Sequence, residues 1–146
     1  MIRPILLVAC AGCLDRLGPE VGPPQQIDPS CDADSDAEHT VSFATEILGG
    51  VLQRNHCLTC HTPTGETPIG LQQSGLDMSS YTKLRAGGGR SGASIIIDDK
   101  PCESILYQKI GPSPPFGSRM PLNLSPVPHP DQLLLHDWIA EGAHDN

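Results

Sequence analysis

The feature that most constrains this chain is the pentapeptide Cys57-Leu58-Thr59-Cys60-His61. Two cysteines three positions apart, with a histidine directly after the second, form the attachment pattern of a c-type haem. One helical turn roughly matches the separation of the two porphyrin vinyl groups, so each sulfur can form a thioether with one vinyl. The neutral imidazole of His61 is then placed under the iron as an axial ligand. The pattern predicts one haem c, held covalently through Cys57 and Cys60.

The composition agrees with a core that a cofactor helps to fill. The 146 residues include one Trp, two Tyr and two Phe, against 15 Gly and 15 Pro. A chain of this length forms one domain plus extensions, and few large side chains are present to build its interior. A haem that buries on the order of 400 Å² of apolar surface would contribute roughly 10 kcal/mol, comparable to the net stability of a domain.

The charge of the chain limits the class of partner. Its net charge is −8, and its nine Lys and Arg residues are scattered. Nucleic acid binding needs clustered basic residues, so we expect no nucleic acid partner. An acidic surface could steer a basic redox partner or simply keep the protein soluble. We expect redox partner proteins and a monomer.

The first 13 residues resemble an export leader. One positive charge, at Arg3, precedes the apolar run 5–9, and small residues and two cysteines follow. Leu7-Val8-Ala9-Cys10 resembles the cleavage box of a bacterial lipoprotein, with Cys10 as the lipid-bearing residue and Cys13 as a second candidate. The run is too short to span a membrane, which needs about 20 apolar residues. We predict an exported protein, either in the periplasm or as a lipoprotein at the outer membrane or cell surface.

A linker rich in proline and acidic residues is predicted for residues 14–40, because this segment has almost no apolar periodicity. Residues 41–146 then form the single predicted domain. Cys31 and Cys102 remain once the leader and haem cysteines are assigned. In an oxidising compartment such a pair usually forms a disulfide, and two free thiols are the alternative.

Apolar periodicity predicts mainly helical structure in the domain. A first helix is expected from Ser42 to about Asn55, and its Gly49-Gly50 pair suggests the close approach of another backbone. Shorter helices are expected near 76–84 and over 103–110, and a last helix over 130–142. We expect a loop over 62–74, a brief β-like run at 95–97 and a solvated turn at 98–99.

The residue on the other side of the iron would decide the function. Met120 is the candidate: it lies in a loop beside Pro121, 59 positions after His61. A thioether sulfur stabilises ferrous iron, raises the reduction potential and blocks small ligands. Met78 is the rival, but its spacing is typical of a core residue. A second histidine ligand, His129, is a further alternative; we expect solvated or locally bonded side chains at His39, His56, His136 and His144.

The helix leading into Cys57, the Met120-Pro121 loop and the terminal Trp138-Ile139 helix resemble small monohaem class I c-type cytochromes. Four further segments resemble the exported cytochrome c domains of planctomycetes and myxobacteria; they are 75–81, 103–107, 117–121 and 137–143. The likeness spans about residues 41–143. Two features depart from the family pattern: Met78, where a leucine would be more usual, and the Cys31 and Cys102 pair.

The resemblance implies a mainly α, loop-rich class I cytochrome c fold, with helices wrapped around one covalent haem. It also implies that the first and last helices cross near the haem edge, and that His61 and Met120 are the axial ligands. We therefore expect an electron carrier rather than an enzyme, with no catalytic residues.

Two other classes of function remain open from the residues alone. If Met120 does not bind the iron, the open sixth site could activate peroxide or bind gases, as in a haem enzyme or sensor. Alternatively, Cys57, Cys60 and His61 could bind zinc without haem. Adjacent Cys60 and His61 are awkward ligands for one tetrahedral ion, and no partner cluster of Cys and His is evident.

Overall fold

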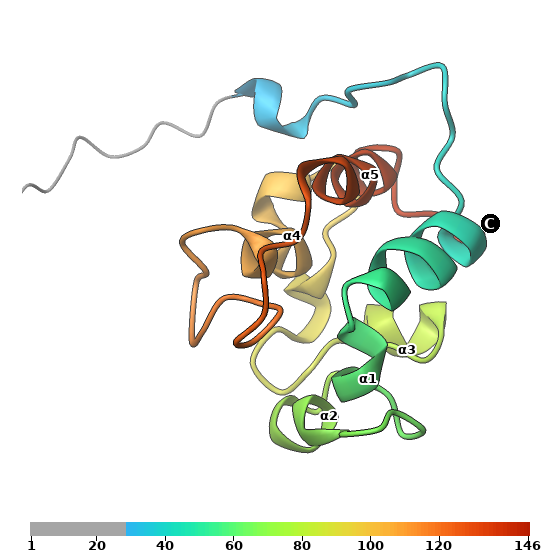
Figure 1. Cartoon of the computed structure of the whole chain (residues 1–146). Coiled ribbons are helices and arrows are strands. Elements are labelled where there is room, and N and C mark those ends of the chain that lie inside the picture. Colours follow the sequence, from blue (N-terminus) through green and yellow to red (C-terminus); the bar gives the residue numbers. More distant parts are fainter. Residues whose placement is uncertain (1–28) are drawn as a thin grey trace, which may run out of the picture.

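The computed structural model describes residues 29–146. The predicted leader, with Cys10 and Cys13, and most of the predicted linker lie outside the described residues. Within them every regular element is a helix or a helical turn, and no strand forms (Figure 1). The predicted mainly α class is confirmed. No helix in this part of the chain is long and apolar enough to cross a membrane.

The domain begins with the π-helix η2 (Phe43–Leu52), which the sequence pattern predicts as a helix from Ser42. The Ser42 hydroxyl accepts a hydrogen bond from the amide of Thr45 at 3.4 Å, which satisfies one of the free amides of the first turn. Phe43, Ile47 and Val51 are buried, so the predicted apolar face is the face that packs inward. The helix delivers the chain into Cys57.

The glycine pair in η2 is explained by the helix itself, so the predicted approach of another backbone is wrong. A Cβ on Gly49 would lie 3.2 Å from the carbonyl oxygen of Ala44, and a Cβ on Gly50 would lie 3.3 Å from that of Thr45. Both carbonyls belong to η2, five residues earlier in the chain. The wide turns of a π-helix bring these oxygens close to the glycines. A Cβ on Gly50 would also lie 3.1 Å from the Nη1 atom of Arg54.

The C-terminal helix α5 (His129–Ala140) packs against η2 (Figure 1). The rings of Phe43 and Trp138 lie 5.3 Å apart, and Tyr81 meets Phe43 edge-on at 5.3 Å. Trp138 is fully buried, and its indole N–H donates to the carbonyl of His144 at 2.9 Å. Three of the few aromatic side chains therefore form the centre of the core, where the first and last helices meet as predicted.

The end of the chain is fastened to the start of η2 (Figure 1). The amide of Phe43 donates to the side-chain oxygen of Asn146 at 2.8 Å, and the amide of Ala44 donates to the Asn146 carbonyl at 3.0 Å. The hydroxyl of Tyr81 donates to the carbonyl of Ala143 at 2.9 Å. Residues 143–146 therefore brace η2 and α5 together.

Short elements connect these two long helices. They are α1 (Cys57–His61), α2 (Ile69–Ser74), α3 (Tyr81–Ala86), η3 (Gly92–Ile95), η4 (Pro101–Glu103) and α4 (Ile105–Ile110). The helix predicted over 103–110 is present as α4. The one predicted near 76–84 begins only at Tyr81, because the chain before it runs without helical bonds and places Leu76 and Met78 in the core.

Two local predictions are wrong. The segment 62–74 contains α2, which ends at Gly75 with a φ of 70° and a hydrogen bond from the Gly75 amide to the Leu71 carbonyl. The run 95–97 is not a strand, since its first residue ends η3 and the Ile97 amide donates to the hydroxyl of Ser104 at 2.8 Å. Ile95 and Ile96 are buried, so their apolar side chains serve the core without a partner strand.

Cys31 and Cys102 form the predicted disulfide, with Cα atoms 6.1 Å apart. The bond joins η1 (Pro29–Asp32) to η4. Beside it, the amide of Ser35 donates to the carboxylate of Asp137 on α5 at 3.0 Å. The end of the predicted linker thus rests on the domain, while the division into leader, linker and domain stays a prediction.

Candidate cofactor site

The motif 57–61 forms a helix of its own, α1, set off from η2 by a turn. His56 has a φ of 59°, in the left-handed region, and this residue changes the direction of the chain between the two helices. Asn55, just before it, is buried and its amide group donates to the Val51 carbonyl at 2.8 Å. Cys57 and Cys60 stand three positions apart on α1, a spacing that puts both side chains on one face.

Both cysteines of α1 are unpaired thiols. The sulfur of Cys57 lies 3.8 Å from the Asn55 carbonyl, and that of Cys60 lies 3.8 Å from the Thr67 hydroxyl. Burial raises the pKa of the Cys57 thiol to about 11, so this sulfur is protonated at neutral pH.

His61 is buried, with 8% of its surface exposed, and its ring is oriented by a backbone carbonyl. The Nδ1 atom lies 3.2 Å from the carbonyl oxygen of Leu76. Since a carbonyl can only accept, Nδ1 carries the proton and Nε2 keeps a free lone pair. Burial lowers the pKa of His61, with the bond to Leu76 acting in the opposite direction. The imidazole is therefore neutral at pH 7, the form that ligates iron.

Helix α2 lies against the nitrogen of His61 that is free to bind a metal. A Cβ on Gly70 would lie 2.7 Å from Nε2 of His61 and 2.9 Å from the carbonyl oxygen of Cys60, so this arrangement admits only glycine. No side chain of α2 is buried, and Ile69 at its start is 52% exposed. A metal bound at Nε2 would lie near Gly70, and because α2 buries no side chain, this helix could shift to make room for it.

The donor set of α1 fits a covalently attached haem in its chemistry. Two reduced thiols share one helical turn, and the neutral histidine that follows has a lone pair on Nε2. A closed metal site of another kind has no support: within residues 29–146, no group of three His, Cys, Asp or Glu side chains could hold a metal ion.

Met120, the candidate for the sixth ligand, lies in the loop between α4 and α5. Its amide donates to the Lys109 carbonyl at 2.8 Å, and its peptide bond to Pro121 is cis. The described contacts of the His61 ring are with Leu76 and Gly70, so the pairing of His61 with Met120 across an iron stays a prediction.

The rival methionine and the other histidines have structural surroundings. Met78 is 5% exposed within the hydrophobic core, as its spacing predicts. His129 is exposed at the start of α5. His39 pairs with Glu46, and His56 and His144 are exposed, as predicted. His136 bonds to its neighbour Asp137, but it is buried and also bonds to the carbonyl oxygen of Cys31, which is distant in sequence.

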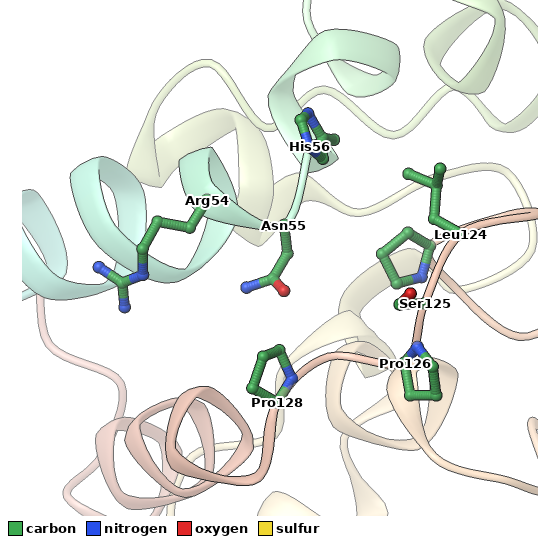
Figure 2. A pocket seen from close by; sticks show the side chains of 8 residues that line it. Arg54, Asn55, His56, Leu124, Ser125, Pro126 and Pro128 are labelled. Atoms are coloured by element: carbon green, nitrogen blue, oxygen red, sulfur yellow. The ribbon is translucent and has the colours of Figure 1, made fainter.

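A cavity of about 260 Å³ opens between the start of α1 and the loop that follows Met120 (Figure 2). His56, which precedes Cys57, and Pro121, which follows Met120, both line this cavity. Its walls come from two segments far apart in the sequence: Arg54, Asn55 and His56 on one side, and Pro121, Leu124, Ser125, Pro126 and Pro128 on the other.

Asp131 on α5 supports this cavity, and nothing in the sequence pattern singled it out. Its carboxylate accepts from Arg54 at 2.6 Å and from the Asn55 side chain at 2.7 Å. Burial alone would raise the pKa of Asp131, but the bonds from Arg54 and Asn55 outweigh burial and hold it below its usual range. Gly70 and the Leu76 carbonyl were likewise missed, because their roles arise from contacts with His61 that no spacing rule reveals.

The sequence model of the family described as Planctomycete cytochrome C matches residues 57–121. The match begins at the first cysteine of α1 and ends at Pro121, directly after Met120. No curated protein and no solved structure matches the chain significantly.

Proposed function

We propose that the protein is a monohaem electron carrier, because residues 57–121 match the family model of planctomycete cytochrome c domains. One haem c is attached through Cys57 and Cys60, with His61 and Met120 as axial ligands. The bound haem supplies a reversible couple between ferrous and ferric iron.

The observation that carries this proposal is the state of His61 on the same helix as two unpaired thiols. The Leu76 carbonyl holds the proton on Nδ1, which leaves a neutral Nε2 as the ligand atom. The Met120 thioether would favour ferrous iron and keep small molecules off the sixth site. Asn55, buried and bonded to Asp131, holds the end of η2 from which the attachment helix begins.

We further propose an exported protein whose redox partners are other proteins. The leader motif supports a place in the periplasm, or at the outer membrane or cell surface with a lipid on Cys10 or Cys13. The Cys31–Cys102 disulfide supports an oxidising compartment. We expect the carrier to act as a monomer.

The test of this function is a visible spectrum of the exported protein, oxidised and then reduced, followed by a haem stain after denaturation. We expect denaturation-resistant haem, sharp low-spin bands, and in the ferric form a far-red sulfur-to-iron band. Met120→Ala should abolish the far-red band and make the ferric haem high-spin or open to added ligands. Met78→Leu is the matched control, because that buried methionine is a core residue and the band should persist.

Other outcomes would change the function assigned. A wild-type protein that is high-spin and readily forms a ferrous carbon monoxide complex would indicate a haem enzyme or gas-binding protein. Zinc at one equivalent without haem would indicate a metal-binding module. Absence of covalent haem after export through a c-type maturation system would refute the electron carrier.

A further inference from the structure

Arg119, the residue before Met120, has a guanidinium nitrogen that lacks an acceptor. Its Nη1 atom is buried and has no hydrogen-bond partner in the described part of the chain. Its Nη2 atom makes one long contact, 3.4 Å from the carbonyl oxygen of Leu124. A buried N–H group that has given up water without gaining an acceptor is unfavourable, and more so on a charged group. The orphaned nitrogen indicates an acceptor that residues 29–146 do not supply.

The other arginines of this part of the chain do have partners. They interact with a carboxylate or an aromatic ring: Arg54 with Asp131, Arg85 with Asp98, and Arg90 with the ring of Phe116. Lys109, in the same region as Arg119, donates to the carbonyl oxygens of Phe116 and Ser118. Carbonyl groups of the loop between α4 and α5 thus accept hydrogen bonds from Lys109, whereas the Nη1 atom of Arg119 has no acceptor among residues 29–146.

The surroundings of Arg119 are cationic, although the protein as a whole is acidic. Arg90 and Lys109 lie over the Phe116 ring, at 4.9 and 5.0 Å from its centroid, and Phe116 is three residues before Arg119. None of these three basic side chains pairs with a carboxylate among residues 29–146. An uncompensated positive cluster of this kind attracts an anion.

The position of Arg119 indicates which anion. It is adjacent to Met120 in sequence and contacts Leu124, which lines the cavity together with Pro121 (Figure 2). The opposite wall of that cavity carries His56, directly before Cys57. The cavity thus lies between the segment that leads into Cys57 and the segment that follows Met120. The anionic groups of a haem are its two propionate carboxylates, which suit the planar donor geometry of a guanidinium.

We propose that Arg119 binds a haem propionate, with Nη1 donating a charge-assisted hydrogen bond to the carboxylate. Arg119 is then a positioning residue for the cofactor, and it offsets the propionate charge beside the iron. This inference rests on the proposed haem-bearing function.

The test is the redox equilibrium of the holoprotein with a reference couple of known potential. Removing the guanidinium leaves the propionate charge uncompensated, which favours ferric iron. We expect Arg119→Gln to shift the equilibrium at least about threefold toward ferric, about 28 mV at 59 mV per tenfold change. Arg119→Lys keeps the charge and should recover about half of this shift. The control is Arg85→Gln, which removes an arginine already paired with Asp98 and should change the equilibrium less than about 1.5-fold.

The far-red sulfur-to-iron band separates this effect from loss of Met120 ligation. A shift with the band retained supports the proposal. An equilibrium in Arg119→Gln no different from that of Arg85→Gln overturns the proposal and leaves the electron carrier intact, whereas a wild-type protein without covalent haem refutes the proposed function itself. If Arg119→Gln does not mature, a structure of the wild-type holoprotein decides: Nη1 bonded to a propionate supports the proposal, and Nη1 bonded to a protein carbonyl or to water refutes it.

Discussion

At the scale of single residues, the site depends on side chains that hold the chain just before the attachment motif. Asn55 occupies the last buried position before Cys57, and its side chain bridges the Val51 carbonyl and the Asp131 carboxylate. Arg54, on the solvent-exposed side, pairs with the same Asp131 carboxylate. Because a buried amide group left unpaired costs about 1–3 kcal/mol, this small network has a measurable role in stability.

We predict that Asp131→Ala lowers the free energy of unfolding by about 1–3 kcal/mol at pH 7, since Arg54 and Asn55 both lose an acceptor. Urea unfolding followed by circular dichroism measures the change. Asp145→Ala, in the exposed C-terminal tail, is the matched control and should fall within about 0.5 kcal/mol of wild type. Equal stability of the two variants would show that the Asp131 network does not support the fold.

The same carboxylate predicts a pH dependence. Its pKa is lowered in the folded protein, so its contribution to stability is complete above the unfolded pKa of about 4 and is lost as the pH falls through the lower folded value. The stability difference between wild type and Asp131→Asn should therefore narrow in acid, below about pH 4. A difference that stays constant from pH 6 down to pH 3 would contradict this assignment. Urea titrations of both proteins at each pH provide the measurement.

At the scale of elements, α2 is the segment whose position bears most directly on the proposed ligand. It packs over Nε2 of His61 through Gly70, yet none of its side chains is buried. Helices η2 and α5 are by contrast tied together by aromatic packing and by the C-terminal residues. Any rearrangement that accompanies iron ligation is therefore expected in α2 rather than in the crossing of η2 and α5.

The substitution Gly70→Ala tests this movement, because the two positions of α2 predict opposite changes in the free energy of unfolding. If α2 leaves His61 in the holoprotein, alanine is tolerated and can stabilise the helix by up to about 1 kcal/mol relative to glycine. If α2 stays, the added methyl overlaps Nε2 and costs about 1–3 kcal/mol. We expect the first result in urea unfolding of the holoprotein. Gln73→Ala, exposed on the same helix, is the control, and a destabilised Gly70→Ala would show that α2 keeps its position over His61 in the holoprotein.

At the scale of the whole molecule, residues 29–35 are held to the domain by the Cys31–Cys102 disulfide and by the bonds of Ser35 to Asp137. The disulfide closes a span of 71 residues, which includes all of α1, α2 and α3. In the chain-entropy model, closing a loop of this length stabilises the folded state by roughly 4 kcal/mol.

The double variant Cys31→Ser, Cys102→Ser should therefore unfold at lower urea concentration, with a loss of roughly 4 kcal/mol at most. Covalent haem should remain, since Cys57 and Cys60 are separate from this bond. Wild type treated with a thiol reductant should match the variant, because thioethers resist reduction. Loss of haem in the double variant would show instead that the disulfide is needed for attachment.

Local patterns were sufficient to predict several parts of this protein. The helices predicted from Ser42 and from about Pro130 follow from apolar periodicity, and the Cys31–Cys102 pairing follows from elimination among the cysteines. Each depends on residues close together in sequence or on a short inventory of cysteines. The predicted resemblance to planctomycete cytochrome c domains is confirmed for residues 57–121, which the family model matches.

The tertiary structure decided the features that depend on residues far apart. The bond from Leu76 that orients His61, the placement of α2 over that ring, and the bonds of Asp131 to Arg54 and Asn55 join separate segments. The local sequence 95–97 predicts a strand. In the folded chain, however, the Ile97 amide donates to the Ser104 hydroxyl, and the side chains of Ile95 and Ile96 are buried in the core. A sequence pattern indicates which face of a segment is buried. It does not indicate which distant residues pack against that face, because those contacts form only when the chain folds.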